Sequence, residues 1–129
     1  MKHALPAVVL FAAGVPAAFA HHSITAMYAE ESRITLEGEV TQLEYRNPHP
    51  VIHLAVVGKD GARSEWLLEW SSKTRLDSRG YTASVLKPGD RLVVTGGPAR
   101  DGSRGMFVGR LQRPADGFEY VSTRFTADR

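Results

Sequence analysis

The chain has 129 residues, of which 43% are hydrophobic and 23% are charged, and its formal net charge is +2 at pH 7. This length suits one domain with a modest core, and a nearly balanced charge without a basic block gives no reason to expect a nucleic-acid partner. The sequence contains no cysteine, which excludes disulfides, thiolate metal sites and cysteine nucleophiles.

Residues 1–20 have the features of a secretory signal peptide: a basic start, an apolar stretch over 4–15 and an Ala-Phe-Ala cleavage site at 18–20. The apolar stretch has about a dozen residues, whereas a membrane-spanning helix needs roughly 20, so we expect cleavage rather than stable membrane insertion. The sequence therefore predicts a periplasmic or secreted bacterial protein whose mature chain begins at His21. A cut after Ala17 is the alternative.

The mature chain is expected to start with an N-terminal arm over residues 21–32, followed by a long first strand over 34–45. The apolar residues of that strand change parity part-way along it. Because side chains alternate with a period of two, this change predicts a bulge or a strong coil near 40–42, and Gly38 would ease the bend.

The next two strands are predicted from alternating apolar residues over 51–57 and 64–70. A stiff Asn-Pro-His-Pro corner at 47–50 precedes the first of them, because both residues that precede a proline are restricted to extended geometry. The Lys-Asp-Gly sequence at 59–61 supplies a hairpin turn between them.

The pattern then changes from strand to helix. Ser71 or Ser72 can cap a short helix that Gly80 ends. Alternation resumes over 91–95 and 106–112, which predicts a fourth and a fifth strand.

This order of elements predicts an all-β fold with small α content: a five-stranded OB-like Greek-key barrel over residues 33–113, with a short helix between strands 3 and 4. A generic small barrel or a sandwich is the alternative. Residues 114–129 are polar and unpatterned, so we expect a flexible tail in which only 118–125 could form an edge segment.

Several stretches of the mature chain carry a family resemblance. They are, in order, HHSITAMY, LEGEVTQLEYRNPHPVIHL, EWLLEW, SVLKPGDRLVVTG and ARDGSRGMFVGRL. The chain from about Ala20 to Leu111 resembles a family of small secreted bacterial proteins known as domain of unknown function 6152. The resemblance implies an exported single-domain β-barrel. It brings no activity and no catalytic residues.

Two adjacent histidines follow the predicted cleavage site. After cleavage, His21 carries a free α-amine beside its imidazole, and these two nitrogens can chelate one metal ion; copper ranks highest among the divalent metals. His22 offers a competing mode through the amine, its own amide nitrogen and its imidazole. The alternative is that both are ordinary polar residues near a chain end.

A further ligand for copper could come from His49 or His53. On one extended strand these two would stand about 13 Å apart, at about 3.3 Å per residue, so they are not expected to chelate a metal by themselves. The sequence thus raises the hypothesis of an exported copper-binding protein in which one of them joins His21.

Three aromatic residues suggest a second hypothesis. Trp66, Trp70 and Tyr45 could form a ligand-binding platform of the kind that OB-folds use, although alternating aromatics on one strand are more often part of the core. The protein would then be a binding module for a small molecule, a peptide, a glycan or an envelope protein, with no metal.

An enzyme is a third class, and the sequence gives it little support. Glu44, Glu65 and Glu69 could imitate paired carboxylates, but charged residues on strand faces usually serve solubility. The sequence has no G-x-S-x-G elbow, and no substrate groove for an oxidative copper enzyme is evident. We therefore assign no catalytic residue.

Overall fold

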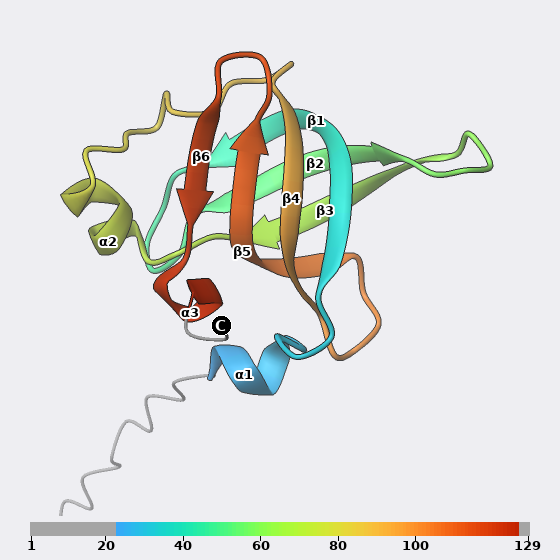
Figure 1. Cartoon of the computed structure of the whole chain (residues 1–129), viewed down its shortest axis with the longest axis horizontal. Coiled ribbons are helices and arrows are strands. Elements are labelled where there is room, and N and C mark those ends of the chain that lie inside the picture. Colours follow the sequence, from blue (N-terminus) through green and yellow to red (C-terminus); the bar gives the residue numbers. More distant parts are fainter. Residues whose placement is uncertain (1–22, 127–129) are drawn as a thin grey trace, which may run out of the picture.

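Residues 23–126 are described by the computed structural model, and they form six strands and three short helices (Figure 1). The strands are β1 (Ile34–Glu44), β2 (Val51–Val57), β3 (Arg63–Glu69), β4 (Arg91–Pro98), β5 (Gly105–Arg113) and β6 (Phe118–Val121). The helices are α1 (Ile24–Met27), α2 (Lys73–Ser78) and α3 (Thr123–Thr126). Within this part of the chain, none of the helices could span a membrane.

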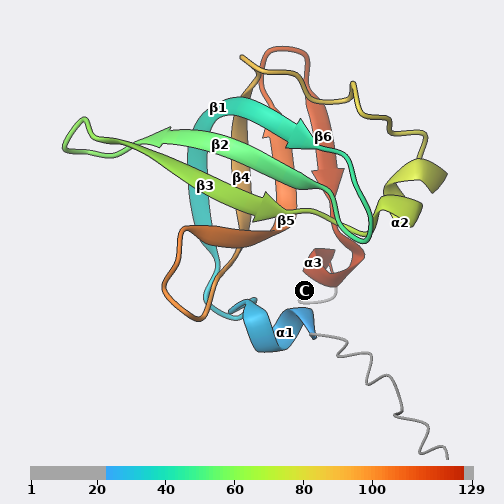
Figure 2. The same ribbon diagram turned by 180° about the vertical axis from the view of Figure 1, so that it is seen from behind.

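The first five strands close into a barrel. They are hydrogen-bonded in the order β3-β2-β1-β4-β5, and a parallel pairing of β3 with β5 joins the two ends of that order. The helix α2 lies between β3 and β4 in the chain, as an OB-fold requires. The predicted fold class is therefore confirmed, and Figure 2 shows the barrel from behind.

The long first strand contains the predicted irregularity. The register of β1 against β2 shifts between Val40 and Gln42, which is the position at which the sequence changes parity. Gly38 lies where β1 pairs with both β2 and β4, and a Cβ atom there would collide with the backbone carbonyl of Ala55. Glycine at this position thus lets β2 approach closely, so that β1 can pair with β2 and with β4 at the same point.

The helix α2 begins and ends where the sequence predicts. The side-chain oxygen of Ser72 accepts a hydrogen bond from the backbone N–H of Arg75 (3.3 Å), so Ser72 is the N-cap. Gly80 follows the last turn with a φ of 82°, in the left-handed region that favours glycine.

The core fills the barrel with alternate side chains of its strands. Aliphatic residues of β1 to β5 that are at most 1% exposed are Val40, Ile52, Leu54, Leu68, Leu92, Val94, Met106, Val108 and Leu111. Full burial of one such side chain contributes about 1.5–3 kcal/mol. An aromatic group extends the core toward α2, where Trp70 stacks on Tyr81 and meets Tyr120 edge-on.

The prediction of a flexible tail from residue 114 is wrong for the residues described up to 126. The strand β6 pairs with the end of β5, and Tyr120 is only 2% exposed. Its ring packs against Trp70, so a buried aromatic contact holds the segment in place. The edge segment expected within 118–125 is confirmed, and the folded domain extends beyond its predicted end at 113.

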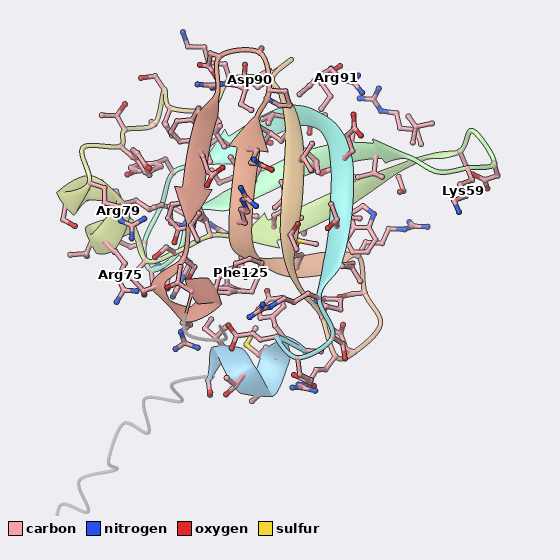
Figure 3. The ribbon with its side chains drawn as sticks, viewed as in Figure 1. Lys59, Arg75, Arg79, Asp90, Arg91 and Phe125 are labelled. Carbon is pink, nitrogen blue, oxygen red and sulfur yellow. The ribbon has the colours of Figure 1, made fainter. Side chains whose placement is uncertain are left out.

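The helix α3 follows β6 and covers the buried Gly109 of β5. A Cβ atom at Gly109 would collide with the ring of Phe125 from α3. Figure 3 shows Phe125 beside the lower part of β5, near α3. Glycine is therefore needed at 109 for the C-terminal helix to lie flat on the sheet.

Candidate functional site

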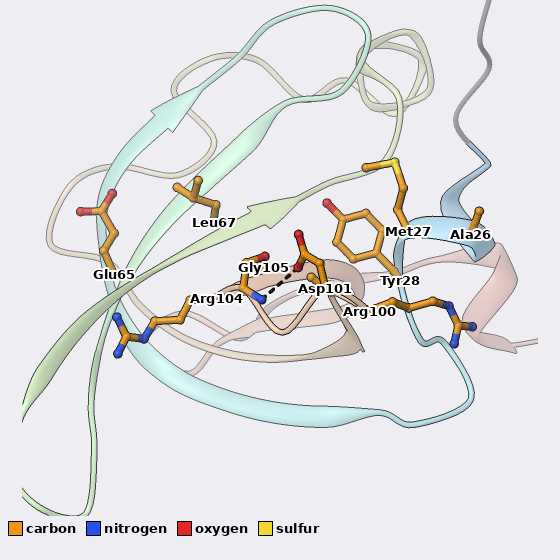
Figure 4. Close-up of a pocket in the computed structure, with 11 residues that line it drawn as sticks. Ala26, Met27, Tyr28, Glu65, Leu67, Arg100, Asp101, Arg104 and Gly105 are labelled. Atoms are coloured by element: carbon orange, nitrogen blue, oxygen red, sulfur yellow. Dashed lines mark hydrogen bonds between the residues drawn. The ribbon is translucent and has the colours of Figure 1, made fainter.

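A groove lies where the N-terminal arm crosses the barrel (Figure 4). It has a volume of about 770 Å³ and is bounded by α1, by the outer face of β3 and by the loop between β4 and β5. We call it the arm groove. Leu67 of β3 and Met27 of α1 line it and are 48% and 40% exposed. Because two large apolar side chains face solvent there, the groove can accept an apolar group.

Charged side chains surround this apolar patch. Glu65, Asp101 and Arg104 also line the arm groove. Hydrogen bonds from the Ser103 side chain and from its backbone N–H (2.9 Å) lower the pKa of Asp101 and favour its ionised form. The Arg104 guanidinium has no hydrogen bond or ion pair with any residue from 23 to 126. It is therefore available to an anionic group of a ligand.

Tyr28 anchors the arm to the barrel. Its ring is 8% exposed and packs against Phe107 at 5.8 Å, and its hydroxyl donates a hydrogen bond to Glu69 of β3 (2.7 Å). Burial and this hydrogen bond raise the pKa of Tyr28, so the hydroxyl stays protonated and remains a donor. A backbone bridge between Tyr28 and Ala99 fixes the arm against the end of β4.

Arg100 provides a second anchor. Its guanidinium forms two parallel hydrogen bonds with Glu31 (2.7 and 2.9 Å) and a third with the backbone carbonyl of Thr25 (3.0 Å). The guanidinium lowers the pKa of Glu31. Because bidentate pairs of this kind fix orientation as well as distance, one wall of the arm groove is preformed.

His53 lies between two carboxylates on the outer face of the β1-β2-β3 sheet. Its Nε2 is 2.5 Å from Glu44 and its Nδ1 is 2.6 Å from Glu65. Partial burial lowers the pKa of His53, but the two hydrogen bonds outweigh it and raise the pKa above its usual value. The hydrogen bond from His53 also lowers the pKa of Glu44. The His53 ring thus links three neighbouring strands.

This arrangement does not suit a metal. The two carboxylates approach opposite nitrogens of the His53 ring, so they share no point at which an ion could contact all three groups. Neither nitrogen of His53 is free to act as a ligand. In the range 23–126, no three histidine, aspartate or glutamate side chains are grouped as a metal would require.

His49 has a different environment. Its Nδ1 is 2.8 Å from the backbone carbonyl of Trp70, and since a carbonyl only accepts, that nitrogen carries the hydrogen. Glu69 lies 3.7 Å from the same nitrogen, and the ring of Phe107 meets the imidazole edge-on. His49 and Tyr28 therefore contact the same two residues. The structure places His49 beside the arm and separates it from the bridge made by His53.

The copper hypothesis depends on His21 and His22, and both lie outside the described residues, as do the predicted signal peptide and its cleavage site. The copper site at the mature N-terminus stays a prediction. So do the export of the chain and its periplasmic location.

The predicted aromatic platform does not form a single exposed surface. Trp70 is 0% exposed and belongs to the core, which is the alternative that the sequence left open. Trp66 is partly buried against the same core. Tyr45 lies near α2, where its hydroxyl donates to Asp77 (2.8 Å) and its ring meets the Lys73 ammonium at 5.2 Å. These three residues do not line the arm groove.

The chain matches the family of unknown function DUF6152 over residues 8–108. It belongs to this family. Membership in DUF6152 confirms the resemblance seen in the sequence, and the description of the family names no activity. None of the curated proteins is similar enough in sequence to match the chain.

A solved structure similar to this DUF6152 member is the N-terminal domain of the PriB protein from Thermoanaerobacter tencongensis, described as dimeric. It is 22% identical, and the match covers 61% of this chain and 91% of that one with a TM-score of 0.45. A score of this size carries no argument about function. The fold assignment of this DUF6152 chain rests on its own strand pairings.

The basic residues of this DUF6152 chain that Figure 3 labels belong to separate parts of the fold. Lys59 lies at the tip of the β2-β3 hairpin, Arg91 lies near the start of β4, and Arg75 and Arg79 lie by α2. The absence of a nucleic-acid partner remains a prediction from the sequence.

Sequence reasoning missed the residues that build the arm groove in this DUF6152 chain. Tyr28 is the only aromatic residue between 23 and 32, and an isolated aromatic in a polar arm is a signal that the arm packs on the domain. Arg104 belongs to no binding motif in the sequence, so no local signal marks it. Leu67 stood out only as an apolar residue on the polar face of β3, between Glu65 and Glu69.

Proposed function

We propose that this chain is an exported binding protein that holds a small ligand in the arm groove. The observation that carries the proposal is the pair of exposed apolar side chains, Leu67 and Met27, in a groove of about 770 Å³. The rim of this groove holds Arg104, whose guanidinium has no partner among residues 23–126. Ligand sites in proteins combine an apolar lining with a few placed polar groups. The ligand would therefore be small and partly apolar, with an anionic group.

Export supports this role. A signal peptide over residues 1–20 would deliver the mature chain to the periplasm or the cell exterior. Tyr28 and Arg100 hold the arm wall of the groove in place before any ligand arrives. A groove that is preformed in this way suits a binding protein.

The test uses the fluorescent probe 8-anilinonaphthalene-1-sulfonate, which has an apolar body and an anionic sulfonate. The mature protein is expected to bind one probe molecule saturably. Leu67→Asn should weaken binding roughly fivefold, because about 1 kcal/mol of apolar contact is lost. Val57→Asn is the matched control, since Val57 is also an exposed strand residue, at 63%, and lies outside the groove. Equal losses in the two variants would refute the proposal.

A second candidate function is copper binding at the mature N-terminus, and the hydrogen bond of His49 favours it. With Nδ1–H donated to the carbonyl of Trp70, the neutral ring presents its lone pair on Nε2. Histidines that bind metals commonly donate their other ring N–H in this way. We propose His49 as the residue that would join the amine and imidazole of His21.

The copper proposal is tested in two steps. The intact mass of the exported protein comes first, because a mature chain that begins before His21 removes the terminal-amine chelate. Cu(II) titration followed by spin resonance should then show nitrogen-rich coordination, weakened at least about tenfold in His21→Ala, in an N-acetylated form and in His49→Ala. His53→Ala is the matched control and should bind as the parent does, because both of its nitrogens contact carboxylates. Copper binding no tighter than that of an unrelated neutral protein would end this proposal.

A further inference from the structure

The strand β3 is paired along only part of its outer edge. Its pairing with β2 covers the whole strand, from Arg63 to Glu69, but its parallel pairing with β5 begins only at Leu67. The loop that precedes β5 turns away from β3 at this point (Figure 4). The first half of β3 therefore forms a sheet edge next to the arm groove.

The direction of the backbone groups on this edge follows from one hydrogen bond. The N–H of Leu67 donates to the carbonyl of Arg104 (2.9 Å), so the odd-numbered residues of β3 point their backbone groups away from β2. By this alternation the N–H and C=O groups of Arg63 and Glu65 face the open edge. Neither residue forms a backbone hydrogen bond across that edge with any other residue in the described part of the chain.

We propose that this edge binds the C-terminal end of an extended peptide, which adds to the sheet as a short strand beside Arg63 and Glu65. The inference rests on the proposed ligand-binding function of the arm groove and names the class of ligand. Unpaired edge groups provide main-chain hydrogen bonds to such a strand, and a groove beside the edge receives its side chains.

The charges around the edge select the direction of the peptide. A guest strand beside Arg63 and Glu65 would occupy the position on the edge of β3 that precedes β5, and β5 runs parallel to β3. If the guest strand is parallel to β3, its C-terminal end lies beside Arg104. If it is antiparallel, its N-terminal end lies there. The guanidinium of Arg104 has no partner among residues 23–126, and in Figure 4 its side chain extends toward the end of β3 that carries Glu65. A terminal carboxylate is attracted there, whereas a terminal amine is repelled. The guest strand is therefore parallel.

The apolar part of the arm groove selects the side chain. Residues of an added strand alternate between the two faces of the sheet, so one side chain near the carboxylate faces Leu67 and Met27. A β-branched or other aliphatic side chain fits this apolar contact. The ligand is thus a peptide with a free carboxylate and an apolar residue at or next to its end.

The test uses the peptide acetyl-Thr-Val-Thr-Val with a free carboxylate, and the same peptide with an amidated end, on the mature ¹⁵N-labelled protein. With the free acid at saturation, amide hydrogen exchange of Arg63 and Glu65 should slow at least about tenfold. Exchange of Trp66 should change little, because its N–H faces β2. The amidated peptide should bind about tenfold more weakly, since it lacks the charged hydrogen bond with Arg104.

Two variants separate the backbone contact from the charge contact. Arg104→Gln should reduce binding of the free acid to the level of the amidated peptide and leave the amidated peptide unchanged. Glu65→Pro removes the edge N–H and should abolish binding, whereas Glu65→Ala, which also loses the contact with His53, should retain it. Because Arg104 is an exposed loop residue, its variant gives a result even if Glu65→Pro does not fold.

Three results would overturn the inference. Chemical shifts at Met27 and Leu67 without slower exchange at Arg63 and Glu65 would mean a groove ligand that adds no strand, and the proposed function would stand. If the protein without peptide has a dimeric mass and already shows slow exchange at the Arg63 and Glu65 amides, a second copy of the chain occupies the edge. The absence of any change at groove residues, for the peptide and for the fluorescent probe, would end both proposals.

Discussion

Replacement of Tyr28 by phenylalanine tests whether one hydroxyl group anchors the arm. The substitution keeps the ring and its contact with Phe107, so the buried apolar area changes little. It removes only the hydrogen bond from the hydroxyl to Glu69 (2.7 Å). Any change in stability therefore reports that bond.

The expected loss follows from the surroundings of the bond. Tyr28 is 8% exposed and the side chain of Glu69 is 20% exposed, so water cannot fully replace the lost donor. Hydrogen bonds to charged groups contribute about 1.5–3 kcal/mol, and Glu69 still has His49 at 3.7 Å, which places this case near 1.5 kcal/mol. For a domain of this size the Tm should fall by about 6–12 °C.

Thermal unfolding followed by circular dichroism measures this loss. Tyr45→Phe is the matched control, because its hydroxyl also donates to a carboxylate, that of Asp77, at an exposed site, with the backbone carbonyl of Tyr81 as a second acceptor at 3.1 Å. It should cost less than about 1 kcal/mol. In the background of Glu69→Gln, the effect of Tyr28→Phe should shrink, which a double-mutant cycle detects. A Tyr28→Phe protein as stable as the parent, or no coupling with Glu69, would refute the reasoning.

Two further predictions concern the outer sheet and the C-terminal helix. Because the folded protein raises the pKa of His53 above its usual 6.5, the stabilisation from its contacts with Glu44 and Glu65 is complete below that value and is lost as the pH rises through the folded pKa. The stability advantage over His53→Gln should therefore fall as the pH rises above 6.5 in urea titrations, and an advantage that stays constant or grows would contradict the bridge. Gly109→Ala should lower the free energy of unfolding by about 1–3 kcal/mol, because the new methyl group forces the ring of Phe125 off the sheet. Adding Phe125→Ala to this variant should recover part of the lost stability. If the losses of the two substitutions are additive in thermal melts, the clash is not the cause.

Local sequence signals predicted the barrel well because they act over short distances. The parity change in β1 located the bulge between Val40 and Gln42, and Ser72 with Gly80 marked both ends of α2. The C-terminal strand was missed as part of the domain because β6 is only four residues long. Its place depends on a contact between Tyr120 and Trp70, which are far apart in the sequence.

The candidate site was less predictable because it is made by pairings between distant segments. The arm groove exists only when Tyr28 reaches Glu69 and when the loop before β5 turns away from β3. No local sequence pattern predicts this contact or the direction of the loop. The bridge at His53 is similar, because its two carboxylates come from strands that only the folded sheet brings together.

The two tryptophans of this chain occupy environments that a spectroscopist can tell apart. The indole N–H of Trp70 is buried without an acceptor among the described residues and is enclosed by Tyr81 and Tyr120, so its emission should report the integrity of the core. Trp66 lies on β3 next to Glu65 and is only partly covered, so its emission should respond to events at the strand edge. The protein thus carries separate optical reporters for unfolding and for binding, and single Trp→Phe variants would assign each signal without any added label.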